Sequence, residues 1–132
     1  MSSESFVENI YIPAQERTPE VDFRFQENQL ALRGEAYPED AASFFGPLLK
    51  SLAAYCESIR EQQLKVEFQL IYFNTSSAKA LMNMIQILEA AARAGTKVEV
   101  RWLFQEEDDV IREFGEDFSL ELKHVQFHVE QL

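Results

Sequence analysis

Residues 65–104, KVEFQLIYFNTSSAKALMNMIQILEAAARAGTKVEVRWLF, decide the fold. Apolar and polar residues alternate over 65–73 and again over 97–104, as they do in strands with one buried face. Between these segments apolar residues recur at helical spacing as far as about Ala94, and Gly95 follows in a position that commonly ends a helix. A strand, a helix and a second strand in this order predict a right-handed parallel crossover.

Similar alternation outside this unit predicts three more strands. Residues 21–25 and 30–33 flank the polar stretch 26–29, so they predict an antiparallel hairpin whose second strand ends at Gly34. A last strand is marked by Val125, Phe127 and Val129.

Each predicted strand has one apolar face. In the strand 65–73 this apolar face is predicted to include Tyr72. The other face carries Asp22, Arg24, Arg33, Glu67, Gln69, Glu99, Arg101, His124, Gln126 and His128. A sheet covered on both faces would lack this polar set. We therefore predict a two-layer α/β fold with a mixed sheet of about five strands and helices on one face.

Two more helices are predicted around this sheet. Because Gly46-Pro47 interrupts the pattern, the first helix is expected to run from Pro47 to about Glu61, after a short turn at which Asp40 is a candidate cap. Its apolar stripe consists of Leu48, Leu52, Tyr55, Cys56 and Ile59. The other, short helix is expected over residues 108–118.

Length and charge restrict the classes of protein that fit. A chain of 132 residues has room for one core. We expect residues 1–9 to be a flexible N-terminus and 10–132 to be a single domain. The net charge of −11 disfavours nucleic acid and anionic lipid as partners. A secretory signal and an apolar run long enough to insert into a membrane are not apparent, and a lone cysteine, Cys56, forms no intramolecular disulfide. We therefore expect a cytoplasmic protein.

The sharpest local feature is the corner Asn74-Thr75-Ser76-Ser77, followed by Lys79. It stands where the strand 65–73 turns into the long helix. Asn, Thr and Ser are ordinary helix caps, and capping accounts for one or two of them. The positive end of the helix dipole would also favour a phosphate on Thr75, Ser76 or Ser77, with Lys79 as a candidate partner for that phosphate. Both interpretations remain open at this point.

Other candidate sites are weaker. His124 and His128 are too far apart along an extended strand to share one metal ion, so we interpret them as solvated histidines of the sheet face. The acidic run 106–109 lacks the glycine and spacing of a calcium loop. No glycine-rich phosphate loop or nucleophile–base pair is evident. The sequence therefore predicts no catalytic residue, metal or cofactor, and a protein that is not an enzyme.

The long helix carries more apolar residues than one buried stripe needs. Met84, Ile87 and Ala91 lie beside the stripe that faces the sheet. They indicate either a helix packed between two neighbours or an adaptable docking surface, for which methionine is well suited. Met84 and Ile87 are thus candidate partner-binding residues.

Several segments also resemble a known family. They are Tyr11-Ile12-Pro13-Ala14, Thr18-Pro19, Gly34-Glu35-Ala36-Tyr37-Pro38-Glu39, Tyr72-Phe73-Asn74-Thr75-Ser76-Ser77 with Lys79, and Gly115-Glu116-Asp117-Phe118. Through them the chain resembles the SiaC family of bacterial regulatory phosphoproteins, from about residue 10 to the end. The element order also resembles STAS domains of the anti-sigma-factor-antagonist type, whose Asp-Ser-Ser-Gly turn is here replaced by Asn-Thr-Ser-Ser.

This resemblance implies a partner-switching function. A protein kinase would phosphorylate Thr75, and a phosphatase of the PP2C type would remove the phosphate. The unphosphorylated protein would bind and activate a diguanylate cyclase, which raises cyclic-di-GMP and favours biofilm. Two alternatives remain: a STAS-type scaffold or ligand-binding module that is not phosphorylated, and a small enzyme that uses the acidic run and the histidines.

Overall fold

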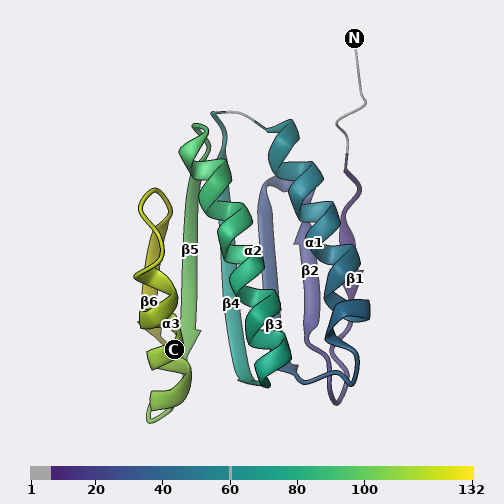
Figure 1. The fold of residues 1–132 in the computed structure, drawn as a ribbon, viewed down its shortest axis with the longest axis vertical. Helices are drawn as coiled ribbons and strands as arrows, with labels where there is room; N and C mark the ends of the chain where they lie inside the picture. The colour runs from purple at the N-terminus through teal and green to yellow at the C-terminus, as the bar shows by residue number, and fades with distance from the viewer. Residues whose placement is uncertain (1–6, 60) are drawn as a thin grey trace.

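A computed structural model describes residues 7–59 and 61–132. They form one six-stranded sheet with three helices, and all three helices lie on the same face (Figure 1). The strands are β1 (Ile10–Ile12), β2 (Glu20–Arg24), β3 (Gln29–Ala36), β4 (Gln63–Phe73), β5 (Lys97–Phe104) and β6 (Gln126–Gln131). The helices are α1 (Ala41–Ser58), α2 (Thr75–Arg93) and α3 (Asp109–Ser119), and the short 3-10 helix η1 (Phe25–Glu27) joins β2 to β3. The predicted two-layer α/β fold is confirmed.

The strands follow one another across the sheet in chain order. β1, β2 and β3 pair antiparallel, whereas β3, β4, β5 and β6 pair parallel. The sheet is therefore mixed as predicted, and β4 and β5 are the parallel pair expected around α2. None of the described helices is long and apolar enough to cross a membrane.

The sixth strand, β1, is missing from the sequence prediction. It has three residues, which is too short to show an alternation pattern, and it pairs with β2 from Ile10 opposite Phe23 to Ile12 opposite Val21. Just before it, the Asn9 side chain accepts a hydrogen bond from the backbone N–H of Gln26 at 3.0 Å. The flexible segment predicted for residues 1–9 overlaps this region, but residues 1–6 lie outside the described residues.

A register shift near the end of β3 and β4 changes which side chains face the core. Gly34 was predicted to end its strand, but β3 continues to Ala36. Gly34 has a φ of 117°, which residues with a side chain rarely adopt. Gly34 pairs with Leu70, and the next pair skips Ile71. This extra residue inverts the alternation, as a β-bulge does. Tyr72 is therefore 51% exposed and Phe73 is buried, so the predicted inward orientation of Tyr72 is wrong.

Helix α1 begins earlier than predicted. Asp40 is its N-cap and accepts a hydrogen bond from the Ser43 backbone N–H at 3.1 Å, and the helix then runs through Pro47 to Ser58. The predicted start at Pro47 and the predicted end near residue 61 are both wrong. Proline disfavours a helical residue before it through clashes with that residue's N–H and Cβ, and the Cβ clash is absent here because the preceding residue is Gly46. The cap and the buried apolar stripe then favour a continuous helix.

The core lies between the sheet and the helices, and Trp102 on β5 joins it to α3. The Trp102 indole N–H donates to the Ile111 carbonyl oxygen at 2.8 Å. Gly115 lies against the same ring: a Cβ at this position would stand 2.4 Å from Trp102 Cδ1. A close approach of α3 to β5 therefore depends on the absence of a side chain at residue 115.

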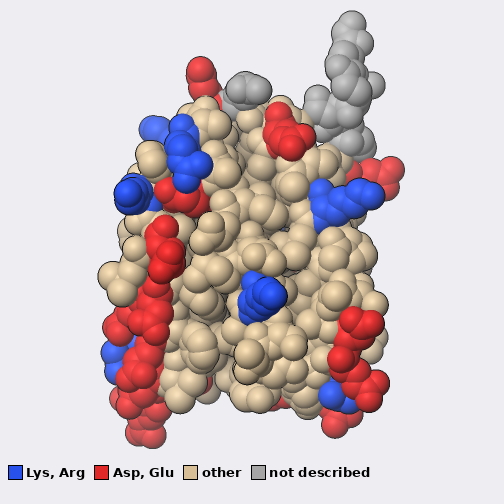
Figure 2. Space-filling view, in the orientation of Figure 1, with Lys and Arg blue, Asp and Glu red and all other residues tan. Residues whose placement is uncertain are grey.

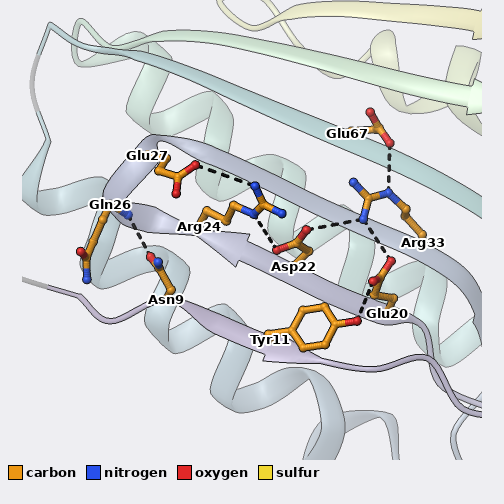
Figure 3. A network of polar contacts seen from close by, with 9 residues as sticks. All are labelled: Asn9, Tyr11, Glu20, Asp22, Arg24, Gln26, Glu27, Arg33 and Glu67. Carbon is orange, nitrogen blue, oxygen red and sulfur yellow. Dashed lines mark hydrogen bonds and ion pairs between the residues drawn. The ribbon is translucent and has the colours of Figure 1, made fainter.

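The uncovered face of the sheet carries Asp22, Arg24, Arg33 and Glu67, as the alternation predicted (Figure 3). Arg33 is central: its guanidinium lies 3.0 Å from a Glu20 carboxylate oxygen, 3.7 Å from one of Asp22 and 3.3 Å from one of Glu67. The Tyr11 hydroxyl donates to Glu20 at 2.8 Å. Partly exposed pairs of this kind contribute little stability one by one, about 0–1 kcal/mol each. Their effect is to keep this face hydrated while the apolar face packs on the helices.

Candidate functional site

The Asn74–Ser77 corner lies at the carboxyl end of β4, where α2 begins. Asn74 has extended backbone angles and is the N-cap of α2, because its side-chain oxygen accepts a hydrogen bond from the Ser77 backbone N–H at 2.9 Å. The Asn74 N–H in turn donates to the Ala36 carbonyl oxygen at 3.2 Å. The cap is thus fixed to the end of β3, and the capping expected of this segment is present.

The three hydroxyl residues of the corner have different environments. Thr75 and Ser76 are exposed, whereas Ser77 is 0% exposed. The Ser77 hydroxyl has no hydrogen-bond partner among the described residues. Thr75 and Ser76 therefore lie at the surface, whereas Ser77 does not. The sequence analysis grouped these three residues together, because the sequence contains no signal that distinguishes their orientations.

The corner also differs in charge from the starts of the other two helices. Asp40 caps α1 and Asp108 caps α3, and α3 has a further acid, Asp109, in its first turn. Hydrogen bonds from the Ser43 hydroxyl and backbone N–H lower the pKa of the Asp40 carboxyl. α2 has the neutral Asn74 as its cap and no acid in its first turn. Among the described α-helices, α2 alone has no carboxylate at its cap or in its first turn to balance the partial positive charge of its N-terminus.

Lys79 is the cation placed to respond to a charge at this corner. It is exposed and follows Thr75 by four residues, which puts the two side chains on the same face of α2. Within the described part of the chain, Lys79 has no ion pair. The corner residues predicted from the sequence are therefore together, with the difference in exposure noted above.

A hollow of about 260 Å³ lies directly beside Thr75. It is lined by Tyr72, Phe73, Asn74, Thr75, Ala78 and Phe114. The Phe114 ring comes from α3 and packs on Phe73, with the ring centroids 4.8 Å apart. The sequence did not predict this hollow because it joins two segments that are about forty residues apart in the chain.

The two histidines do not form a site together. His124 precedes β6, so its assignment to the sheet face is wrong: its Nδ1 lies 2.8 Å from a Glu89 carboxylate oxygen. His128 Nε2 lies 3.5 Å from Glu99. Within the described residues, no group of three or more histidine, cysteine or acidic side chains is arranged to hold a metal ion.

Glu89 is the buried charge that the sequence analysis missed. Its carboxylate accepts hydrogen bonds from the backbone N–H groups of Lys123, His124 and Val125 at 3.0–3.1 Å. Burial raises the pKa of Glu89, but the hydrogen bonds from the His124 side chain and the three N–H groups outweigh it and lower the pKa to about 2. The clue in the sequence was an acidic residue among the apolar residues of α2. Glu89 fixes the loop before β6, and its hydrogen-bond partners do not include residues of the corner.

The two residues proposed as a partner surface on α2 have different environments. Met84 is 1% exposed and belongs to the core, so it offers no surface to a partner and that part of the prediction is wrong. Ile87 is partly exposed and lines a groove between α1 and α2, together with Cys56. Burial raises the pKa of the Cys56 thiol to about 12, so this thiol stays protonated at neutral pH. The docking function of Ile87 stays a prediction.

The fold and this corner define a small two-layer α/β domain that presents exposed hydroxyl residues at the start of a helix. The sequence model described as "SiaC family regulatory phosphoprotein" matches residues 12–132, so the chain belongs to the SiaC family. The resemblance to the SiaC family seen in the sequence is confirmed.

Two solved structures and one relative found by sequence agree with this assignment. The chain superposes on apo-SiaC from Pseudomonas aeruginosa with a TM-score of 0.83 and 27% identity, over 92% of this chain and 98% of that one. SiaC in complex with the diguanylate cyclase SiaD, also from Pseudomonas aeruginosa and described as its activator, gives a TM-score of 0.86 at 27% identity, over 93% and 99%. An uncharacterized protein of Pseudomonas aeruginosa strain UCBPP-PA14 is 29% identical over 110 residues, 83% of this chain and 86% of its own.

Proposed function

We propose that this chain is a phosphorylation-controlled partner switch and a regulator rather than an enzyme. In its unphosphorylated form it binds and activates a signalling enzyme, a diguanylate cyclase, and so raises cyclic-di-GMP in support of biofilm formation. A protein kinase phosphorylates Thr75 and ends this binding, and a phosphatase of the PP2C type restores it. Membership of a family of regulatory phosphoproteins supports the proposal, as does the relative described as the activator of SiaD.

The observation that carries the proposal is the position of Thr75 at the start of α2. It is an exposed residue with a hydroxyl group at the first position of a helix that has no carboxylate at its cap or in its first turn. A phosphate adds about −1.5 to −2 charges there at neutral pH, and a helix N-terminus favours an anion. The fold is therefore expected to tolerate the modification, and its effect falls on the surface around the corner.

A partner that covers Thr75 would have to remove water from the added phosphate. Burying an ionised group without a matching cation is strongly unfavourable. A partner surface formed around a neutral hydroxyl is therefore expected to dissociate when the phosphate is added. This places the switch in the interface, with little rearrangement of the core.

Phosphate mapping and a cyclase assay together test the proposal. Mass spectrometry of protein isolated from its host is expected to find phosphate on Thr75. Purified wild-type chain is expected to stimulate cyclic-di-GMP formation from GTP by SiaD or by a cyclase of the host. Thr75→Asp is expected to lose roughly tenfold or more in apparent affinity for the cyclase.

The matched control is Ser76→Asp, which adds the same charge one residue further along the helix. It is expected to retain more of the activation than Thr75→Asp, since Thr75 and not Ser76 lines the hollow. Absence of phosphate on Thr75, or full activation by Thr75→Asp, would contradict the switch. A scaffold or ligand-binding module would then be the better description.

A further inference from the structure

The hollow beside Thr75 is open, largely apolar and formed by two helices and a strand end. α2 supplies Thr75 and Ala78, α3 supplies the Phe114 ring, and β4 ends at its wall with Phe73. Val110 precedes Phe114 by one turn, so it lies on the same side of α3, and it is 63% exposed. The apolar lining therefore continues from the hollow onto the surface of α3.

Uncompensated acids lie next to this apolar surface. Glu113 and Asp117 are exposed residues of α3 on either side of Phe114 in the sequence, and neither has an ion pair within the described ranges 7–59 and 61–132. By contrast, Asp109 and Glu116 on the same helix are paired with Arg112. Figure 2 shows acidic side chains along the side of the molecule where α3 lies, whereas the middle of the helical face carries few charged groups.

We infer that this hollow is the seat for one apolar side chain of the diguanylate cyclase, and that basic residues of the same cyclase segment contact Glu113 and Asp117. The inference rests on the proposed function and names the docking surface within it. Charge complementarity selects the occupant: a net charge of −11 with unpaired carboxylates on the exposed side of α3 favours a basic segment over an acidic one or a second copy of this chain.

The position of Thr75 on the rim gives the phosphate its effect. A phosphoryl group there occupies the mouth of the hollow together with its hydration shell. An apolar side chain of the cyclase then enters only if that water is removed. The basic residues of the same segment cannot neutralise the phosphate, because they are already bound at α3 on the opposite wall. Phosphorylation and docking thus exclude each other through one small volume.

Filling the hollow from inside tests this inference without changing Thr75. Ala78→Leu adds a larger side chain at a partly exposed position of α2, where leucine is also a good helix former. Its matched control is Ala54→Leu, at an exposed position of α1 that does not line the hollow. The assay is stimulation of SiaD, or of the host cyclase that the wild-type chain activates. Ala78→Leu is expected to raise the half-maximal concentration roughly tenfold or more, and Ala54→Leu to leave it within about twofold.

A second pair of variants tests the charges at exposed positions where folding is not at risk. Glu113→Gln with Asp117→Asn is expected to weaken activation at low salt and to reduce its dependence on salt, because screening acts on exposed charges. Glu116→Gln, on the same helix but paired with Arg112, is expected to change both less.

Each outcome separates the docking surface from the switch itself. If the wild-type chain activates no cyclase, the proposed function fails and this inference with it. If the wild-type and Ala78→Leu chains activate equally, the docking surface is wrong and the switch stands. Loss of phosphorylation with normal activation in Ala78→Leu assigns the hollow to the kinase, and equal loss in both leucine variants shows that the effect is not local. Either result overturns the inference.

Discussion

The first turns of α2 and α3 have the same kind of capping hydrogen bond but different charge. In each, an Asn or Asp side chain accepts a hydrogen bond from the backbone N–H three residues later, at 2.9 Å in α2 and 3.1 Å in α3. α3 adds the carboxylates of Asp108 and Asp109, whereas α2 has none in its first turn. An added anion is therefore favoured at the start of α2 and meets repulsion at the start of α3. This difference supports the proposal that the start of α2 receives a phosphate.

The two regions also differ in how firmly they are packed. α3 is held by the Trp102 hydrogen bond to Ile111 and by the contact of Gly115 with the same ring. The loop that follows α3 is held by Glu89. At the start of α2, by contrast, Thr75 and Ser76 project from the surface. α3 therefore forms a fixed wall of the hollow, whereas the start of α2 is the region where phosphorylation would change the chemistry of the hollow.

The largest expected effect is the loss of the α3 contact in Gly115→Ala. The new methyl would lie 2.4 Å from Trp102 Cδ1, so α3 must shift or the buried indole must move. Overpacking of this kind destabilises by about 1–3 kcal/mol, and we expect the upper end of that range because the neighbour is a rigid ring. The gain of about 1 kcal/mol in helix propensity then leaves a net loss of about 2 kcal/mol. Urea unfolding measures the change.

The control for this variant is Gly46→Ala in α1, where an added Cβ has no neighbour within 4 Å. There the gain in helix propensity is opposed by the clash expected before proline, so the net change is expected to be smaller, about 1 kcal/mol or less. Equal stability of Gly115→Ala and wild type would show that α3 is not held against Trp102. Phosphorylation of Thr75 is expected to persist in both variants.

A smaller effect is expected from Glu89→Gln, which removes the buried charge beneath the loop before β6. The amide oxygen still accepts hydrogen bonds, but it accepts them more weakly than a carboxylate, so we expect a loss of about 1–2 kcal/mol at neutral pH. Thermal unfolding of both proteins between neutral and acidic pH measures it.

The pH dependence gives this prediction its sign. The folded-state pKa of Glu89, about 2, is below its ordinary value of 4.5, so the folded protein favours the charged form. Its stabilisation is complete above pH 4.5 and is lost as the pH falls towards 2. The stability difference between wild type and Glu89→Gln should therefore narrow over that interval. A constant difference would exclude titration of Glu89 as its cause.

The parts of the fold that could be predicted from the sequence are those with a regular spacing of apolar residues along the chain. The strands and the helix within residues 65–104 were predicted from alternation and helical spacing, and the structure places them as expected. β1 was missed because three residues carry no period, and its pairing depends on β2. The inward orientation of Tyr72 failed because a bulge at Ile71 adds one residue to the alternation, which depends on the register with β3.

The candidate site was readable only in part, for a related reason. The Asn74–Ser77 corner followed from its place between a strand and a helix. The burial of Ser77, the Glu89 hydrogen bonds and the contribution of Phe114 to the hollow all depend on contacts between distant segments. Met84 was misassigned as a candidate partner residue because helical spacing alone does not show that it is buried in the folded chain.

The smallest expected effect comes from exchanging the caps of the two helices, and it tests the comparison most directly. Asn74→Asp introduces a carboxylate at the start of α2, which is expected to raise stability by about 0.3–1 kcal/mol at low ionic strength. Asp108→Asn removes one from the start of α3 and is expected to lower stability by a similar amount. Thermal unfolding at low salt and at about 0.5 M salt measures both changes, since screening weakens them.

The double variant separates charge from cap geometry. Asn and Asp are nearly equal as N-caps, so the hydrogen bonds to the backbone N–H groups of Ser77 and Ile111 should survive in both single variants. The two changes should therefore nearly cancel in Asn74→Asp with Asp108→Asn, and both should fade at high salt. Destabilisation by Asn74→Asp at low salt would show that the start of α2 does not favour an anion. A phosphate on Thr75 would then have to disturb the helix itself, and the switch would act through the fold and not only through the interface.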